Sequence, residues 1–355
     1  MRRPLLLPWM LFGTMPLGAQ DHVANGDMEL YILCPDYVSQ IERCMGWNRP
    51  TAGTSDYFNA CLGVPFSMSV PDNQMGDEPA RSGNGYTGLY AFGGFDINAQ
   101  QPNSYREYIT HALSPPLTPG TTYTVSFHVS LADVSKYAVN DLGALFSMAP
   151  PTRTDDHAID RIPQVAWGPA GWLDDKTGWT RIAGCFTADS AYTTLTIGNF
   201  QGPGLAFLQV TTNYPLTDWS YYYVDDVSVR SVEAPQLGPD TSACGPVLLQ
   251  VIDPDPGAGH LWNTGHIGPA LLVDSSGTYA VTQVHPDCPV SDSITVTIGD
   301  RVPIALPRDT LVDLCVHPTV TFDIGPLPSG ATAHWSDGTA GPQCRSEEHT
   351  SELQS

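Results

Sequence analysis

The residues best placed to do chemistry in this sequence are carboxylates, and their spacing does not favour catalysis. A glycosidase needs two carboxylates about 5–10 Å apart, and nothing singles out a pair such as Glu107 and Asp133. The chain has no GxSxG, HExxH or P-loop motif and no GxGxxG motif after a strand-like run. Its ten histidines form no HxH or HxxxH pair. We therefore expect a protein that is not an enzyme.

Three carboxylates could instead bind a cation. Calcium takes six to eight oxygen ligands from carboxylates and carbonyls. Asp27 and Glu29 lie in the first strand-like segment and Asp225 in the last, so the three meet if these segments pair. Asp225 shares its strand parity with Tyr223 and is expected to face the core, where a carboxylate needs a partner. We expect a structural calcium ion at Asp27, Glu29 and Asp225; the alternative is that these acids are surface or turn residues.

A second group of polar residues suggests a ligand site. Tyr105, Arg106 and Tyr108 fall in one short segment, and Asp133 ends another. One interpretation is a ligand-facing cluster of these four residues, and the other is a buried ion pair between Arg106 and Asp133 that fixes strand order. Sugar rings stack on aromatic faces, although most buried aromatic residues are packing residues. The abundant aromatic residues are Trp47, Tyr57, Tyr86, Tyr90, Tyr105, Tyr108, Trp167, Trp172, Trp179, Trp219 and residues 221–223.

Charge and composition narrow the class of protein. The 355 residues include 15 Lys and Arg against 37 Asp and Glu, a formal net charge of −22. This balance argues against nucleic acids and anionic membrane surfaces as partners, because both require a basic patch. The 33 glycines and 32 prolines disfavour long helices and are typical of many short strands separated by turns. We therefore expect an all-β chain.

Both ends of the chain differ from the rest. Arg2 and Arg3 precede an apolar run at 5–17 and small residues at 18–19, so residues 1–20 are expected to be a secretory signal peptide. No later stretch approaches 18 apolar residues, and we expect no transmembrane segment. Residues 345–355 resemble a translated sequencing-library adapter, which predicts that the natural sequence is truncated after Cys344.

The middle of the chain divides into a large domain and two smaller repeats. Residues 21–233 contain alternating strand-like runs and are expected to form one β-sandwich. A Pro-rich linker leads to residues 236–300, which contain the Cys…Trp…Cys pattern of an immunoglobulin-like sandwich around Trp262. Residues 303–344 restart the pattern around Trp335. This second copy lacks its closing strands, so we expect it to be an incomplete domain.

Eight cysteines predict disulfides in an exported chain. We expect Cys244 to pair with Cys288 across the sheets beside Trp262. The four cysteines of the first domain allow three pairings. Among these we expect Cys34–Cys61, with Cys44–Cys185 as the remaining pair.

Residues 22–232 resemble the large N-terminal β-sandwich of secreted and cell-surface proteins from gliding, type IX-secreting bacteria. The segments that carry the resemblance are Asn25-Gly-Asp-Met-Glu29, Cys34-Pro35, Gly46-Trp-Asn-Arg-Pro-Thr51, Asp56-Tyr-Phe-Asn-Ala-Cys61, Val64-Pro65, Ser82-Gly-Asn-Gly-Tyr-Thr-Gly88, Tyr105-Arg-Glu-Tyr-Ile109, Ser130-Leu-Ala-Asp133, Ile197-Gly-Asn-Phe200 and Tyr222-Tyr-Val-Asp-Asp-Val-Ser-Val229. The first and last of them also look like the opening and closing strands of carbohydrate-binding-module jelly rolls, with Met28 in place of phenylalanine.

The resemblance implies a jelly-roll fold whose paired terminal strands often hold calcium. It also implies immunoglobulin-like or PKD-like repeats downstream, and a C-terminal gliding-motility-associated or type IX sorting domain that outer-membrane export machinery recognises. That signal would lie beyond Cys344. The implied location is secreted or on the exterior of the outer membrane.

Together these observations predict a non-catalytic adhesion or binding protein. Its first domain would bind glycans or other surface polymers, and its repeats would act as spacers. One alternative is an accessory binding module of a larger secreted enzyme whose catalytic part lay downstream. The other alternative is a purely structural surface protein.

Overall fold

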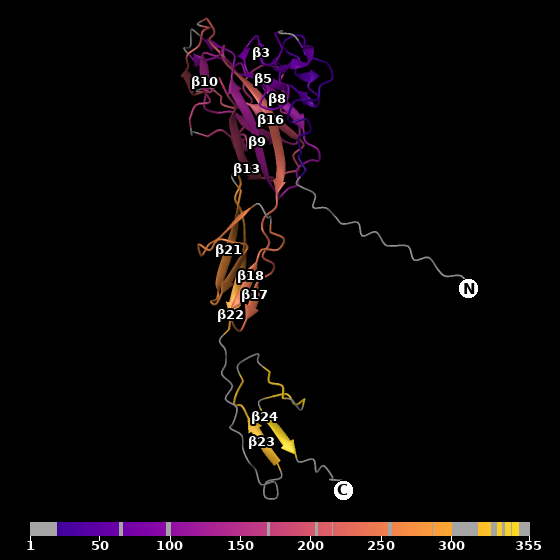
Figure 1. Ribbon diagram of the computed structural model, residues 1–355, viewed down its shortest axis with the longest axis vertical. Coiled ribbons are helices and arrows are strands. Elements are labelled where there is room, and N and C mark those ends of the chain that lie inside the picture. The colour runs from indigo at the N-terminus through magenta and orange to yellow at the C-terminus, as the bar shows by residue number, and fades with distance from the viewer. Residues whose placement is uncertain are drawn as a thin grey trace, which may run out of the picture. The chain divides into compact units, whose positions relative to one another are not determined.

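The all-β prediction is confirmed. The computed structural model describes residues 20–63, 67–96, 101–168, 171–202, 205–214, 216–254, 258–285, 287–299, 319–327, 332–335, 338–341 and 343–347. Within these ranges the regular elements are strands and two 3-10 turns, η1 (Ile41–Arg43) and η2 (Ala60–Leu62) (Figure 1). No helix in the described ranges is long and apolar enough to cross a membrane. Residues 1–19 of the expected signal peptide lie outside them.

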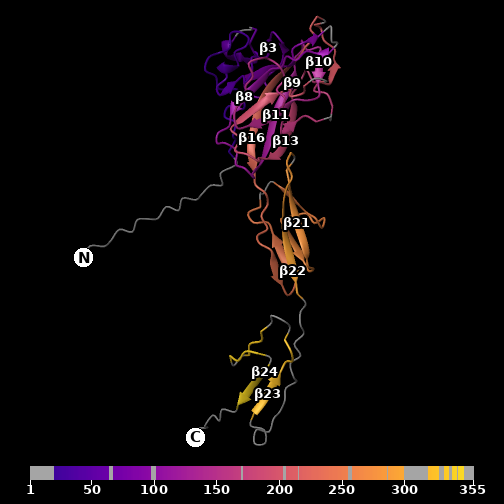
Figure 2. The ribbon, with the colours of Figure 1, turned by 180° about the vertical axis from the view of Figure 1, so that it is seen from behind.

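Two five-stranded antiparallel sheets form the jelly-roll sandwich of the first domain. Figure 1 labels β5, β9, β13 and β16 of the first sheet, and Figure 2 labels β8 and β11 of the second. In spatial order the first sheet is β13 (Thr180–Thr187), β9 (Thr122–Leu131), β16 (Ser220–Val232), β5 (Gly85–Phe92) and β2 (Asp56–Asn59). The second sheet is β1 (Trp47–Asn48), β8 (Tyr108–Ala112), β14 (Thr194–Gly198), β11 (Gly143–Ser147) and β12 (Val165–Ala166). The domain also contains three short strand pairs: β3 (Asp72–Asn73) with β4 (Gly76–Asp77), β6 (Phe95–Asp96) with β7 (Gln101–Pro102), and β10 (Tyr137–Val139) with β15 (Phe207–Gln209).

The long strand β16 is buried on both faces over its first half. Tyr222 and Val224 point into the main core between the sheets, as the two-residue period of a strand requires. Tyr221 and Tyr223 point to the opposite face, where they pack with Met75 and other apolar residues in a second cluster. The alternation predicted a half-buried strand, and the second face is buried because part of the chain covers it.

The first and last segments of the sandwich pair, which was the condition for the predicted calcium site. The His22 amide donates to the Val229 carbonyl, and the Val227 amide donates to the Gly26 carbonyl, both at 2.8 Å. A Cβ at Gly26 would overlap the Val227 carbonyl. Position 26 therefore requires glycine for the two segments to approach this closely.

One of the predicted disulfides is confirmed. Cys34 is bonded to Cys61. Cys44 is not in a disulfide; it is fully buried, with its sulfur 3.9 Å from that of Met28.

The other two predicted pairings are wrong, because Cys185 is bonded to Cys288. Cys44 precedes β1, an edge of one sheet, whereas Cys185 lies in β13, an edge of the other. Cys244 follows β17, which pairs with β22 at Ile298, the end of that strand remote from Cys288.

The described residues between 236 and 299 contain six strands, as a four-stranded and a two-stranded sheet. The order of the first is β17 (Thr241–Ala243), β22 (Val290–Ile298), β21 (Gly277–Val284) and β19 (Gly259–Trp262); the second pairs β18 (Val247–Gln250) with β20 (Ala270–Val273). Trp262 is buried, as expected of a core residue. Pro254–Leu261 and Val281–Asp292 group with Met1–Pro235 in one compact unit.

The internal repeat is visible in local hydrogen bonding. The indole of Trp262 donates to the Gly268 carbonyl, and that of Trp335 donates to the Gly341 carbonyl, both at 2.9 Å. In the described part of the second copy, β23 (Thr319–Asp323) pairs with β24 (Gln343–Glu347). Cys315 lies outside the described residues.

Candidate functional site

The carboxylates expected to bind calcium are held by backbone amides. Buried Asp225 accepts hydrogen bonds from the amides of Arg81 (3.0 Å) and Ser82 (3.3 Å). Glu29 accepts from the amide of Gly85 at 2.9 Å, while Asp27 is exposed. Burial, reinforced by the charge of the neighbouring Asp226, raises the pKa of Asp225 to about 8.

The side chains of Asp27, Glu29 and Asp225 are not arranged as a calcium-coordination site. Among the described residues, no three His, Cys, Asp or Glu side chains stand close enough together to hold a metal. Glu29 and Asp225 both anchor the turn at 81–85, but each uses different amides of it. Their oxygens therefore already have donors, and calcium at this place stays a prediction.

The predicted ligand-facing cluster is not assembled. Arg106 is only 2% exposed and Tyr108 is fully buried. The Tyr108 hydroxyl donates to the Asn199 carbonyl at 2.6 Å. Asp133 accepts from the Asp77 amide at 3.1 Å. Arg106 and Asp133, both described, form no ion pair, because Arg106 enters β8 in one sheet and Asp133 follows β9 in the other.

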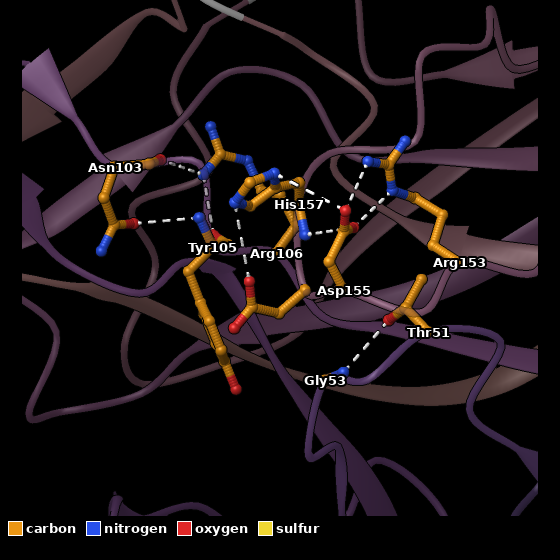
Figure 3. Close-up of polar contacts among 9 residues, drawn as sticks. Thr51, Gly53, Asn103, Tyr105, Arg106, Arg153, Asp155 and His157 are labelled. Atoms are coloured by element: carbon orange, nitrogen blue, oxygen red, sulfur yellow. Dashed lines mark hydrogen bonds and ion pairs between the residues drawn. The ribbon is translucent and has the colours of Figure 1, made fainter.

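Arg106 stabilises the loop before β8 through hydrogen bonds to its backbone. One of its terminal nitrogens donates to the carbonyls of Asn103 (2.7 Å) and Tyr105 (2.8 Å), as Figure 3 shows. Its Nε has no acceptor. Burial lowers the pKa of Arg106 to about 10, so the guanidinium stays charged at neutral pH. A buried charge held only by carbonyls is costly, and here it fixes the backbone on either side of Ser104.

A second loop braces Tyr105 from the other side. The Arg106 amide donates to the Asp156 carbonyl at 2.7 Å, and Tyr105 forms a strand-like bridge with His157. In the same loop Arg153 makes two hydrogen bonds to Asp155, at 2.7 and 2.9 Å (Figure 3). Tyr105 is therefore set in a fixed backbone rather than on a free loop.

Tyr105 is one of three partly exposed aromatic residues that gather at one place. We call Tyr90, Tyr105 and Trp219 the aromatic patch. The Tyr90 ring lies 5.9 Å from that of Tyr105 and 6.0 Å from that of Trp219, both edge to face. Edge-to-face contacts are the favoured geometry of aromatic pairs and hold the rings in place. Any side chain at Gly93 would overlap the Tyr105 ring.

Two buried carboxylates lie beneath the patch. Glu107 accepts from the Tyr105 hydroxyl (2.6 Å) and from the Tyr90 amide (3.0 Å). Asp56 accepts from the hydroxyl of Tyr221, whose ring lies 4.8 Å from that of Tyr90. Burial, with the charge of Glu107 adding to it, raises the pKa of Asp56 to about 7. Glu107 therefore holds Tyr105 in place, and Asp56 holds Tyr221, on which Tyr90 packs.

Polar groups border the patch. The exposed Thr54 hydroxyl is 3.1 Å from the Tyr105 hydroxyl. Asn103 and Asp218 flank Gly94, each with an atom 3.4 Å from where a Cβ would stand. Aromatic faces bordered by hydroxyl, amide and carboxylate groups can bind a molecule that has both apolar faces and hydroxyls.

Tyr86 and Tyr223, which also lie on the outer face of the first sheet, are by contrast covered. Tyr223 donates to Asn73 at 2.9 Å, and Tyr86 donates to the Glu78 carbonyl at 2.9 Å. Asn73 and Glu78 belong to residues 67–80, which we call the covering segment. Because this segment fills that face, Tyr86 and Tyr223 are not available to a ligand.

Sequence reasoning found Tyr105 but did not separate Tyr90 and Trp219 from the other aromatic residues. It also gave no role to Asp56. The one usable signal was the segment 105–108, which carries both Tyr105 and Glu107. The gathering itself depends on strand pairing, since Tyr221 of β16 lies opposite Tyr90 of β5.

The chain matches no known family model, and no curated protein sequence is similar enough to count as a match. Among solved structures it is similar to the CBM22-1 xylan-binding domain of Xyn10C from Paenibacillus barcinonensis, with 13% identity, TM-score 0.32, and coverage of 57% of this chain and 99% of that one. It is also similar to the K1 cleaved adhesin domain of Lys-gingipain from Porphyromonas gingivalis (14%, 0.28, 53% and 92%). A third is a putative sugar binding protein from Bacteroides thetaiotaomicron (10%, 0.27, 60% and 100%). These likenesses concern the β-sandwich fold and carry no argument about function.

Proposed function

We propose that this chain is an exported, non-catalytic binding or adhesion protein whose jelly-roll domain recognises glycans through the aromatic patch. The observation that carries the proposal is the fixed, partly exposed gathering of Tyr90, Tyr105 and Trp219. A sugar ring has apolar C–H faces and equatorial hydroxyls, which match aromatic faces and the polar groups of Thr54 and Asn103. Preorganised rings also reduce the entropy lost on binding.

Export is supported by the N-terminal sequence and by the disulfides. Residues 1–20 have the pattern of a signal peptide. Two disulfides, Cys34–Cys61 and Cys185–Cys288, suit an oxidising compartment. We propose that the protein is secreted or located on the outer-membrane surface, and that export machinery recognises a C-terminal signal. Residues 236–300 and the repeat around Trp335 would then space the jelly roll from the surface.

A glycan array probed with the full chain tests the function. We expect binding to at least one glycan class, and about tenfold weaker binding, or about 1.4 kcal/mol, for Trp219→Ala and for Tyr105→Ala. Trp172→Ala is the matched control, because Trp172 is 36% exposed on the same domain and lies outside the patch. Its affinity should equal that of the parent chain.

Two results would overturn the proposal. Absence of binding to every glycan would favour a purely structural surface protein. Binding that Trp172→Ala weakens while Trp219→Ala and Tyr105→Ala do not would place the site elsewhere. The Tm of each variant must equal that of the parent chain, so that a loss of folding is not mistaken for a loss of binding.

A further inference from the structure

The edge strand β13 carries two neighbouring bonds to a segment far along the chain. Arg181 and Cys185 are four residues apart, so their side chains leave the same face of the strand. Arg181 makes two hydrogen bonds to Asp287, at 2.6 and 2.7 Å. Cys185 forms a disulfide with Cys288, which directly follows Asp287 in the sequence. One ion pair and one disulfide therefore fix the same short segment between β21 and β22.

This segment lies downstream of the linker. The jelly roll ends with β16 at Val232, and Glu233 and Ala234 are exposed. Residues Val281–Asp292 nevertheless group with Met1–Pro235 in one compact unit. The two parts of the chain are therefore joined twice by covalent bonds, once through the linker peptide and once through the disulfide.

We propose that Cys185–Cys288 is a retention bond, which keeps the jelly roll attached to the downstream chain when the linker is cut. Glu233 and Ala234 of the linker are exposed, and exposed connections with small or polar residues are preferred sites of proteolytic cleavage. With the disulfide in place, hydrolysis at this linker leaves one covalent molecule. The ion pair alone would not suffice, because Arg181 is 45% and Asp287 25% exposed at the side chain, and exposed ion pairs contribute little.

Reduction is the condition that releases the jelly roll. A dithiol reductant such as dithiothreitol opens the disulfide by thiol exchange and becomes a cyclic disulfide itself. Cys185 and Cys288 each gain one electron and one proton. Release therefore requires both a cut linker and a reducing agent, and neither alone is enough.

The test inserts a site-specific protease sequence between Glu233 and Ala234 of the full chain. After complete cleavage, we expect one band on a denaturing gel without reductant and two fragments with dithiothreitol. Cys185→Ser should give two fragments without reductant. The double variant Cys34→Ser/Cys61→Ser, which removes the other disulfide of the described residues, should still give one band.

Two fragments from the cleaved parent chain without reductant would overturn the proposal, as would peptide mapping that finds Cys185 and Cys288 as free thiols. One band from cleaved Cys185→Ser without reductant would also overturn it, because another bond would then hold the parts. The parent chain alone, with and without reductant, decides the question if a cysteine variant fails to fold.

Discussion

The hydroxyl of Tyr221 donates a 2.6 Å hydrogen bond to the carboxylate of Asp56, and both side chains are buried. The second oxygen of Asp56 accepts from the Ser39 amide at 2.6 Å. Buried Glu107 adds a nearby negative charge that disfavours ionisation. This arrangement places a weakly stabilised carboxylate at the base of the aromatic patch.

The first prediction concerns pH. The pKa of Asp56 is raised from its ordinary 3.8 to about 7 in the folded state. Its contribution to stability is fully present below about pH 4 and is lost as the pH rises through 7, because the native state binds more protons than the unfolded state in that window. Glu78 and Asp225 have pKa values raised by burial to about 6 and 8 and act in the same direction.

Asp56→Asn should therefore flatten, though not abolish, the fall in unfolding free energy between pH 4 and pH 8. Urea denaturation at several pH values measures the slope. Asp155→Asn is the control, because Arg153 holds the pKa of Asp155 at about 2 and its titration lies outside the window. An equal slope for Asp56→Asn and the parent chain would contradict the prediction.

The second prediction concerns the pairing of the terminal segments. Gly26→Ala should destabilise the jelly roll by about 1–3 kcal/mol, because the methyl group would overlap the Val227 carbonyl. Gly202→Ala, where nothing lies within 4 Å of the added Cβ, should change stability much less. Chemical denaturation compares the two, and similar losses would show that the contact at Gly26 is not decisive.

The third prediction concerns Cys44. Burial raises the pKa of its thiol well above the ordinary range, and the thiolate is the form that attacks alkylating reagents. In the native protein at pH 8, Cys44 should resist iodoacetamide, and in denaturant it should be alkylated. Mass spectrometry of the Cys44 peptide measures both, and rapid labelling of the native protein would show that the thiol is accessible.

The fourth prediction concerns calcium. If Asp27, Glu29 and Asp225 bind it as the sequence predicts, added calcium should raise the Tm relative to EDTA by mass action. Glu29→Gln should remove the difference, while Asp155→Asn, an acid elsewhere on the domain, should keep it. Equal Tm values in calcium and EDTA would exclude the site.

The fifth prediction concerns residues 303–344. Limited proteolysis should trim the chain to about residue 300 while the jelly roll persists. The described part of this copy has a single pair of strands, β23 and β24, and a two-stranded sheet rarely has independent stability. Protease resistance equal to that of residues 236–300 would contradict the prediction.

The strand content and the sandwich were predictable because they depend on local patterns. The alternation along 221–232 predicts β16, and the matching sequences around Trp262 and Trp335 predict a repeated unit. Both are encoded within a few residues, so tertiary context does not change them.

The contacts between distant segments were not predictable in the same way. The disulfide of Cys185 with Cys288 requires knowledge of which sheet edge meets which turn. The same holds for Arg106, which sequence reasoning paired with Asp133. Arg106 instead bonds carbonyls within three residues of itself, a contact for which composition and charge give no signal.

The turn shared by Trp262 and Trp335 has a consequence for how such a chain can evolve. Its bonds are made within its own residues: the Gly265 amide donates to the Trp262 carbonyl, and the Gly338 amide repeats this at Trp335. A duplicated copy thus carries with it the information for this turn and needs no matching change in its neighbours. Gene duplication can therefore add or remove whole copies, which for the proposed spacers would change their length without altering the aromatic patch.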